Sequence, residues 1–82
     1  MPLRQGRGVH ATDDAIVFMM RDTKTGEVVP CTISAAALSR LAGRPGVPFE
    51  DVFDEKRLTI EEIASRIYDA GQARPVLDDA AV

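Results

Sequence analysis

The chain has 82 residues, of which 45% are hydrophobic and 28% charged, and its formal net charge is −3. This length allows a single small domain. The only cysteine, Cys31, and the only histidine, His10, leave no disulfide framework and no cluster of metal ligands at zinc spacing.

A lone thiol and a start without an apolar segment predict an intracellular, cytoplasmic protein. No run approaches the roughly 20 apolar residues of a membrane helix. Residues 1–44 carry six basic and four acidic side chains, whereas residues 45–82 carry four basic and nine acidic ones. Neither part has the dense basic stripe that is typical of nucleic-acid-binding proteins.

Residues 1–12 are rich in glycine and arginine and show no periodicity. We interpret them as a flexible N-terminal arm with weak basic character. A single domain is expected over residues 13–78, followed by a frayed tail over 79–82.

Two apolar runs, 16–20 and 28–33, flank the four-residue loop 23–26 and predict a β-hairpin. Gly26 suits a left-handed final loop residue. Counting back from the loop places apolar pairs on one face, which burial should enforce. The predicted pairs on that face are Met20–Val29, Phe18–Cys31 and Ile16–Ile33. On the opposite face they are Arg21–Val28, Met19–Pro30 and Val17–Thr32.

The second face is not cleanly polar. Val17, Met19 and Val28 form a small apolar patch there, which needs a cover or a partner. Pro30 cannot donate to a strand ladder, so the far side of its strand is expected to be an edge. A third strand should then lie beside residues 16–20.

Helix signals follow the hairpin. Ser34 is a good N-cap for a helix over residues 35–42, which Gly43 ends. Pro48 suits the start of a second helix, which is expected to run to Ala70 with an apolar stripe from Phe49 to Ile67. The stripe is interrupted at residues 56–57, and residues 59–62 resemble a capping box. We expect this helix to be continuous, with a break near residue 58 as the alternative.

Residues 73–77 can supply a short final strand. The predicted fold is a two-layer α+β domain of β-β-α-α order with an optional last strand. An antiparallel hairpin or three-stranded sheet is covered on one face by two helices.

No catalytic, metal-binding or cofactor-binding residue is predicted. Cys31 lies on the buried face, away from the only histidine, and a buried thiol packs as a small hydrophobe. The acidic residues of the second helix fit a solvated surface. They are Glu50, Asp51, Asp54 and Glu55. The chain is therefore not expected to be an enzyme.

Two surfaces are candidates for binding. Tyr68, on the flank of the apolar stripe, is expected to pack against the core with its hydroxyl reaching water, and the alternative is a role as an interface residue. The candidate interface is then Val17, Met19, Val28 and Tyr68. The alternative is contact with nucleic acid through Arg4, Arg7, Arg21 and Arg44.

Three segments of the chain resemble a family of short bacterial proteins, domain of unknown function 1488. They are Ile16-Val17-Phe18, then residues 26–34 with Ala37-Leu38, then Phe53 with Arg57 and residues 60–64 leading to Tyr68 and Gly71. The resemblance implies a small α+β fold and lends no activity.

The sequence thus favours an uncharacterised, non-catalytic protein-interaction or accessory module. Its partner would be another protein or a second copy of the chain. The alternative is a nucleic-acid-associated regulatory protein that uses the basic arm.

Overall fold

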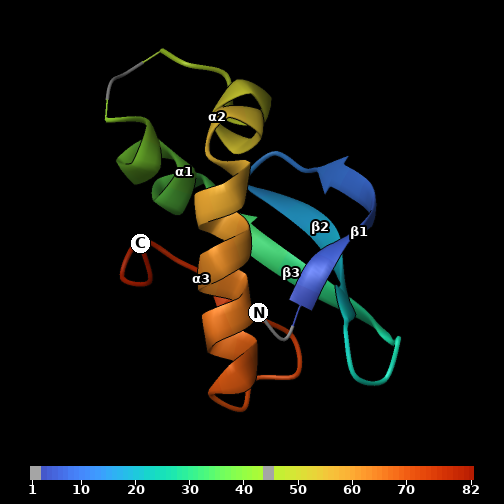
Figure 1. Ribbon diagram of the computed structural model, residues 1–82. Helices are drawn as coiled ribbons and strands as arrows, with labels where there is room; N and C mark the ends of the chain where they lie inside the picture. The colour runs from blue at the N-terminus through green and yellow to red at the C-terminus, as the bar shows by residue number, and fades with distance from the viewer. Residues whose placement is uncertain (1–2, 44–45) are drawn as a thin grey trace.

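The computed structural model describes residues 3–43 and 46–82, except the side chain of Arg7. It contains a four-stranded sheet with three helices packed on one side (Figure 1). The strands are β1 (Leu3–Ala11), β2 (Ala15–Asp22), β3 (Val28–Ser34) and β4 (Val76–Leu77). The helices are α1 (Ala35–Ala42), α2 (Phe49–Glu55) and α3 (Arg57–Asp69). The two-layer α+β prediction is confirmed.

The sheet order is β1-β2-β3-β4. The first three strands are antiparallel neighbours, and β4 runs parallel to β3. The hairpin of β2 and β3 has the predicted register at every pair, from Ile16–Ile33 to Arg21–Val28. Its loop is closed by the Asp22 amide, which donates to the Glu27 carbonyl at 2.9 Å. Gly26 has a φ of 75°, as a left-handed loop residue requires.

The flexible arm predicted over residues 1–12 is wrong, because residues 3–11 form β1 along β2. The register shifts between Gln5 and Val9, because the four residue steps between them in β1 lie opposite only two residue steps in β2, from Met20 to Phe18. Gly6 permits this bulge, since a Cβ there would lie 2.8 Å from the Met19 carbonyl oxygen. Gly8 contributes a φ of 107°. The glycines that suggested disorder therefore shape an irregular edge strand.

Strand β3 is expected to be an edge strand on the side away from β2, and the structure agrees with this only in part. The final strand forms there, with the Thr32 amide donating to the Pro75 carbonyl at 3.0 Å. It pairs only with Thr32 and Ile33, beyond the proline, so no amide is needed from Pro30. The predicted neighbour of residues 16–20 exists too, but it is β1.

Helix α1 has the predicted bounds and caps. The Ser34 hydroxyl oxygen accepts from the Ala37 amide at 3.1 Å, and Gly43 ends the helix with a φ of 67°. Both ends of α1 are therefore capped as the sequence predicts.

The expected continuous second helix is wrong. Lys56, with φ −103° and ψ 15°, separates α2 from α3, and the two helices run in different directions (Figure 1). In an unbroken helix, position 56 would lie on the apolar stripe between Val52 and Ile60, both of which are buried. The break leaves the lysine half-buried and lets both flanking segments face the core. Thr59 lies inside α3 and is not its cap.

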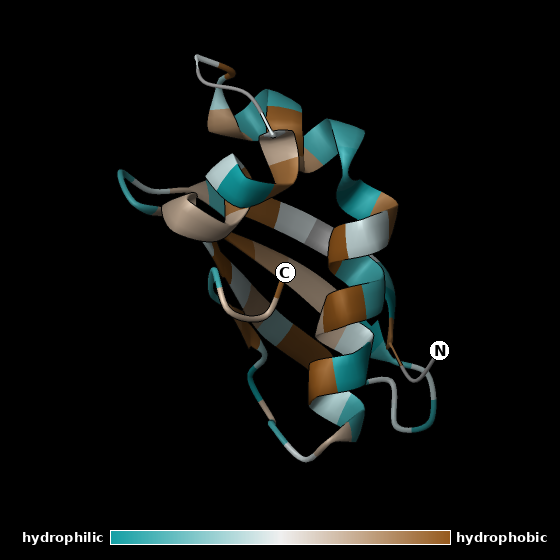
Figure 2. Cartoon of the chain, turned by 90° about the vertical axis from the view of Figure 1, so that its left-hand side faces the viewer, coloured by the Kyte–Doolittle hydropathy of each residue, from teal (hydrophilic) through white to brown (hydrophobic). Residues whose placement is uncertain are grey.

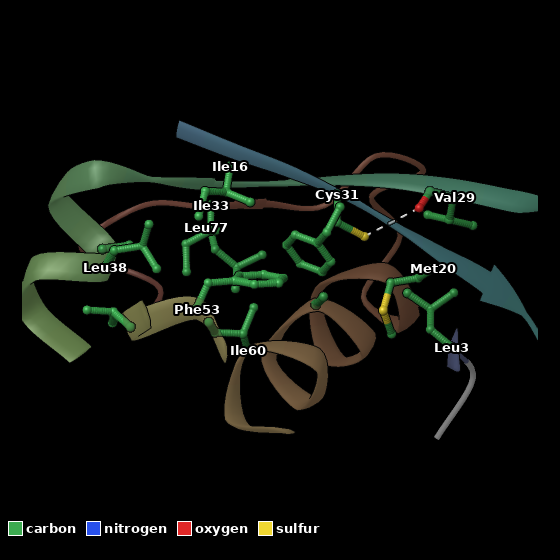
Figure 3. Packing of buried hydrophobic residues seen from close by; sticks show 14 residues of the cluster. Leu3, Ile16, Met20, Val29, Cys31, Ile33, Leu38, Phe53, Ile60 and Leu77 are labelled. Carbon is green, nitrogen blue, oxygen red and sulfur yellow. Dashed lines mark hydrogen bonds between the residues drawn. The ribbon is translucent and has the colours of Figure 1, made fainter. Parts of the chain in front are cut away.

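One apolar core lies between sheet and helices (Figure 3). Phe18 and Phe53 meet at its centre with ring centroids 5.2 Å apart. Figure 2 shows hydrophobic and hydrophilic residues alternating along the helices, with hydrophobic residues also on the strands. The frayed tail expected over 79–82 is also wrong. Val82 packs half-buried against the core, and the Asp78 carboxylate accepts from the amides of Ala80 and Ala81.

Candidate functional site

The candidate site is the face of the sheet that points away from the helices. Within the residues that the structure describes, all three helices lie on the other face (Figure 1). We call this uncovered surface the open face. The strand register places on it the side chains of Arg4, His10, Val17, Met19, Arg21, Val28, Pro30, Thr32 and Val76.

The open face holds together the apolar patch that the sequence predicts. Val17 and Met19 are neighbours along one face of β2, and both are half-buried. Val28 lies diagonally across on β3 and is 54% exposed. Val76, also 54% exposed, adds a fourth apolar side chain at the β4 edge. The patch is therefore available to a partner.

Two arginines stand opposite each other at one end of this face. Arg4 on β1 is the register partner of Arg21 on β2, and both are exposed. Like charges directly opposite each other on neighbouring strands destabilise a sheet. Arg21 donates one hydrogen bond to the Gly26 carbonyl. Among the described residues, neither guanidinium has an acidic side chain as an ion-pair partner.

The arginines and the patch share a shallow hollow of about 430 Å³. We call it the arginine hollow. Gly6 lies in its lining, where a larger residue could not fit against the Met19 backbone. The full lining is Arg4, Gln5, Gly6, Met19, Met20, Arg21 and Val28. A charged group and an apolar group can therefore be bound side by side here.

Of the four arginines named as nucleic-acid contacts, the structure brings two together. The side chain of Arg7 and the whole of Arg44 lie outside the described residues. Sequence reasoning missed the pairing of Arg4 with Arg21, because it interprets residues 1–12 as an arm. The available signal for a strand is Leu3, an apolar residue near the start of the segment, which is buried.

Tyr68 lies away from the apolar patch, because α3 packs on the covered face of the sheet. Its hydroxyl donates to Asp22 Oδ2 at 2.5 Å. The other carboxylate oxygen of Asp22 accepts from the amides of Lys24 and Thr25 at 2.7 and 3.2 Å. Tyr68 therefore fastens the hairpin loop to α3.

These hydrogen bonds shift the pKa values of Asp22 and Tyr68. The Tyr68 hydroxyl, followed by the Lys24 amide, lowers the pKa of Asp22 below its ordinary value. The pKa of Tyr68 is raised, chiefly because its hydroxyl donates to Asp22. Sequence reasoning placed Asp22 at the closure of the hairpin loop, but it missed the hydrogen bond between Asp22 and Tyr68.

The nucleophilic side chain of Cys31 is enclosed in the core. Burial raises the pKa of its thiol to about 12, which removes the reactive thiolate at neutral pH. The Sγ atom lies 3.6 Å from the Val29 carbonyl oxygen (Figure 3). His10 is exposed on the opposite face of the sheet, so the two side chains do not form a catalytic pair.

Acidic side chains gather on the helices. Glu50, Asp51, Asp54 and Glu55 are exposed on α2, as expected for a solvated surface. On α3, Glu61 is buried and accepts from Arg57 Nε at 3.1 Å. Over residues 3–43 and 46–82, no three His, Cys, Asp or Glu side chains converge as a metal site.

The comparisons with known proteins identify the family. The family described as "Protein of unknown function (DUF1488)" matches residues 4–77. The chain belongs to DUF1488. No curated protein and no solved structure matches it.

The DUF1488 match begins within β1 and ends within β4. The match therefore includes most of β1, which the sequence predicts as an arm, and both arginines of the hollow, Arg4 and Arg21. In this DUF1488 chain, no helix of the described residues is long and apolar enough to span a bilayer.

Proposed function

We propose that this protein is a non-catalytic interaction module that binds another protein through the open face. The observation that carries the proposal is a sheet face left uncovered by the helices, with an apolar patch beside two arginines. Exposed apolar surface next to charge is typical of protein-binding sites.

The side chains available for chemistry support a binding role over catalysis. The Cys31 thiol is buried and protonated at neutral pH. A second hollow, of about 670 Å³, lies between α1 and α2. The described residues in its lining are not titratable: Ser39, Ala42, Gly43, Gly46, Val47, Phe49 and Val52.

The charges on the open face favour a different protein over a second copy. None of the open-face side chains is acidic. A two-fold dimer through this face would offer the arginines of each copy no acidic partner, because both copies present the same surface. A different protein that carries acidic groups would complement these arginines.

The test compares two matched aspartate substitutions in the full chain, used as bait in extracts of its native cell. Val28→Asp places a charge in the patch, whereas Leu58→Asp places one on α3, where the leucine is 77% exposed. We expect the unmodified chain and Leu58→Asp to recover the same partner. Val28→Asp should reduce its recovery at least about tenfold, because it puts a charge into the apolar patch and a competing carboxylate opposite Arg21.

Circular dichroism melting of each variant checks that it is folded. Undiminished recovery with folded Val28→Asp would contradict the proposal. So would a loss of the partner on Leu58→Asp alone.

A further inference from the structure

We infer that the arginine hollow binds the carboxylates of an extended acidic segment of the partner protein, with an apolar side chain of that segment against Met19 and Val28. The inference rests on the proposed function and adds the chemistry of the partner.

The charges of the hollow define the first requirement. Arg4 and Arg21 face the same solvent from adjacent strands, at a register position where two like charges repel. A carboxylate bound between the two guanidinium groups would be attracted to both and would offset their mutual repulsion. A guanidinium also matches a carboxylate with two parallel hydrogen bonds. The pair therefore selects an anionic group from its partner.

The shape of the hollow defines the second requirement. Gly6 presents no side chain, so the floor beside the Met19 backbone stays open. Met19 and Val28 form apolar walls next to the guanidiniums. A methionine side chain adapts easily to differently shaped apolar groups. An extended segment with acidic and apolar residues two positions apart would present both to the same surface and so meet both kinds of wall.

The surroundings favour a protein carboxylate over a nucleic-acid phosphate. The open face, as the described strands define it, has no Phe, Tyr or Trp, and His10 lies at the opposite end of β1 from Arg4, so bases would find no stacking platform beside the arginines. The chain has a net charge of −3, and α2 exposes four acidic side chains. A long polyanion would be repelled by the rest of the molecule, whereas a short acidic segment would contact only the hollow.

The test is an NMR titration of the ¹⁵N-labelled full chain at low salt. The probe is a capped five-residue peptide of glutamate, serine, leucine, serine and glutamate, in which both carboxylates and the apolar side chain share one face of the extended chain. We expect saturable shifts of the amides of Arg4, Arg21 and Val28, which weaken as salt is added. The same peptide with glutamine for glutamate should bind at least about tenfold more weakly.

Two double variants locate the effect. Arg4→Gln with Arg21→Gln should abolish the shifts. Arg40→Gln with Arg66→Gln removes the same charge from exposed sites on α1 and α3 and should leave the titration unchanged. Equal binding of the glutamine peptide, or binding that survives loss of Arg4 and Arg21, would overturn the inference.

A parallel titration with a single-stranded oligonucleotide separates the two anions. Tighter, salt-dependent binding of the oligonucleotide at the same amides would also overturn the inference. The proposed function fails separately, when Val28→Asp does not reduce partner recovery. If recovery depends on Val28 but not on Arg4 and Arg21, the function stands and the acidic segment is wrong.

Discussion

Some side chains of β2 stabilise the fold, whereas their neighbours in the chain form the open face. Asp22 and Arg21 are adjacent in β2, yet their side chains point to opposite faces. Asp22 binds the hairpin loop and Tyr68 on the covered face. Arg21 reaches the hollow on the other. The alternation of strand residues was readable from the sequence, and it predicted Val17, Met19 and Val28 correctly as neighbours.

The candidate role of Tyr68 could not be decided from the sequence. Its position on the flank of a helix stripe favours packing against the core, but it is also consistent with an interface. The deciding contact joins residues 46 positions apart in the chain, which no local pattern reveals.

Replacing Tyr68 with phenylalanine tests this contact. The ring remains, but Asp22 loses a hydrogen-bond donor, so its pKa should rise toward the ordinary 3.8. A carboxyl with a depressed folded-state pKa stabilises the fold above its unfolded-state pKa. It loses that contribution as the pH falls through the folded-state pKa. We therefore expect Tyr68→Phe to be less stable at neutral pH and to lose less stability on acidification.

Urea unfolding at a series of pH values from about 2 to 7 measures this difference, with the Asp22 titration followed by NMR. Parallel stability curves for the two proteins would show that Tyr68 does not support the Asp22 carboxylate.

The observed helices and strands match the sequence prediction where local signals agree. They differ from it where tertiary packing sets the bounds of an element. The hairpin and α1 were predictable, because turn, cap and periodicity all indicated the same bounds. The break at Lys56 was marked by a lysine on an apolar stripe, but its position depends on how α2 and α3 pack against the core. Strand β1 was missed because Gly6 and Gly8 belong to a bulge whose shape is set by β2.

Gly6→Ala tests the account of β1. The new methyl group would lie 2.8 Å from the Met19 carbonyl oxygen, so the bulge must move away from β2. We expect a loss of about 1–3 kcal/mol of stability, together with faster amide hydrogen exchange along β1. Gly26→Ala is the control, since nothing lies within 4 Å of its Cβ and only its positive φ is strained, at about 1 kcal/mol. Faster exchange in β1 on Gly26→Ala, and not on Gly6→Ala, would refute the role assigned to the bulge.

The molecule as a whole is asymmetric in both polarity and charge. Its sheet carries a core on one side and the open face on the other, while the exposed acidic side chains of α2 lie on the helix layer. The uneven charge along the sequence anticipated this separation, because residues 1–44 supply β1 to β3 and residues 45–82 supply α2 and α3. A one-sided molecule of this kind is suited to binding a partner on its sheet and leaving its helices in solvent.

Photo-cross-linking in the native cell tests this claim most directly. A benzophenone amino acid is placed at Met19 on the open face, or at Leu58 on the solvent-exposed surface of α3. We predict a discrete cross-linked adduct with another protein from position 19 and none from position 58. An adduct from position 58 alone, or none from position 19, would contradict a binding role for the open face.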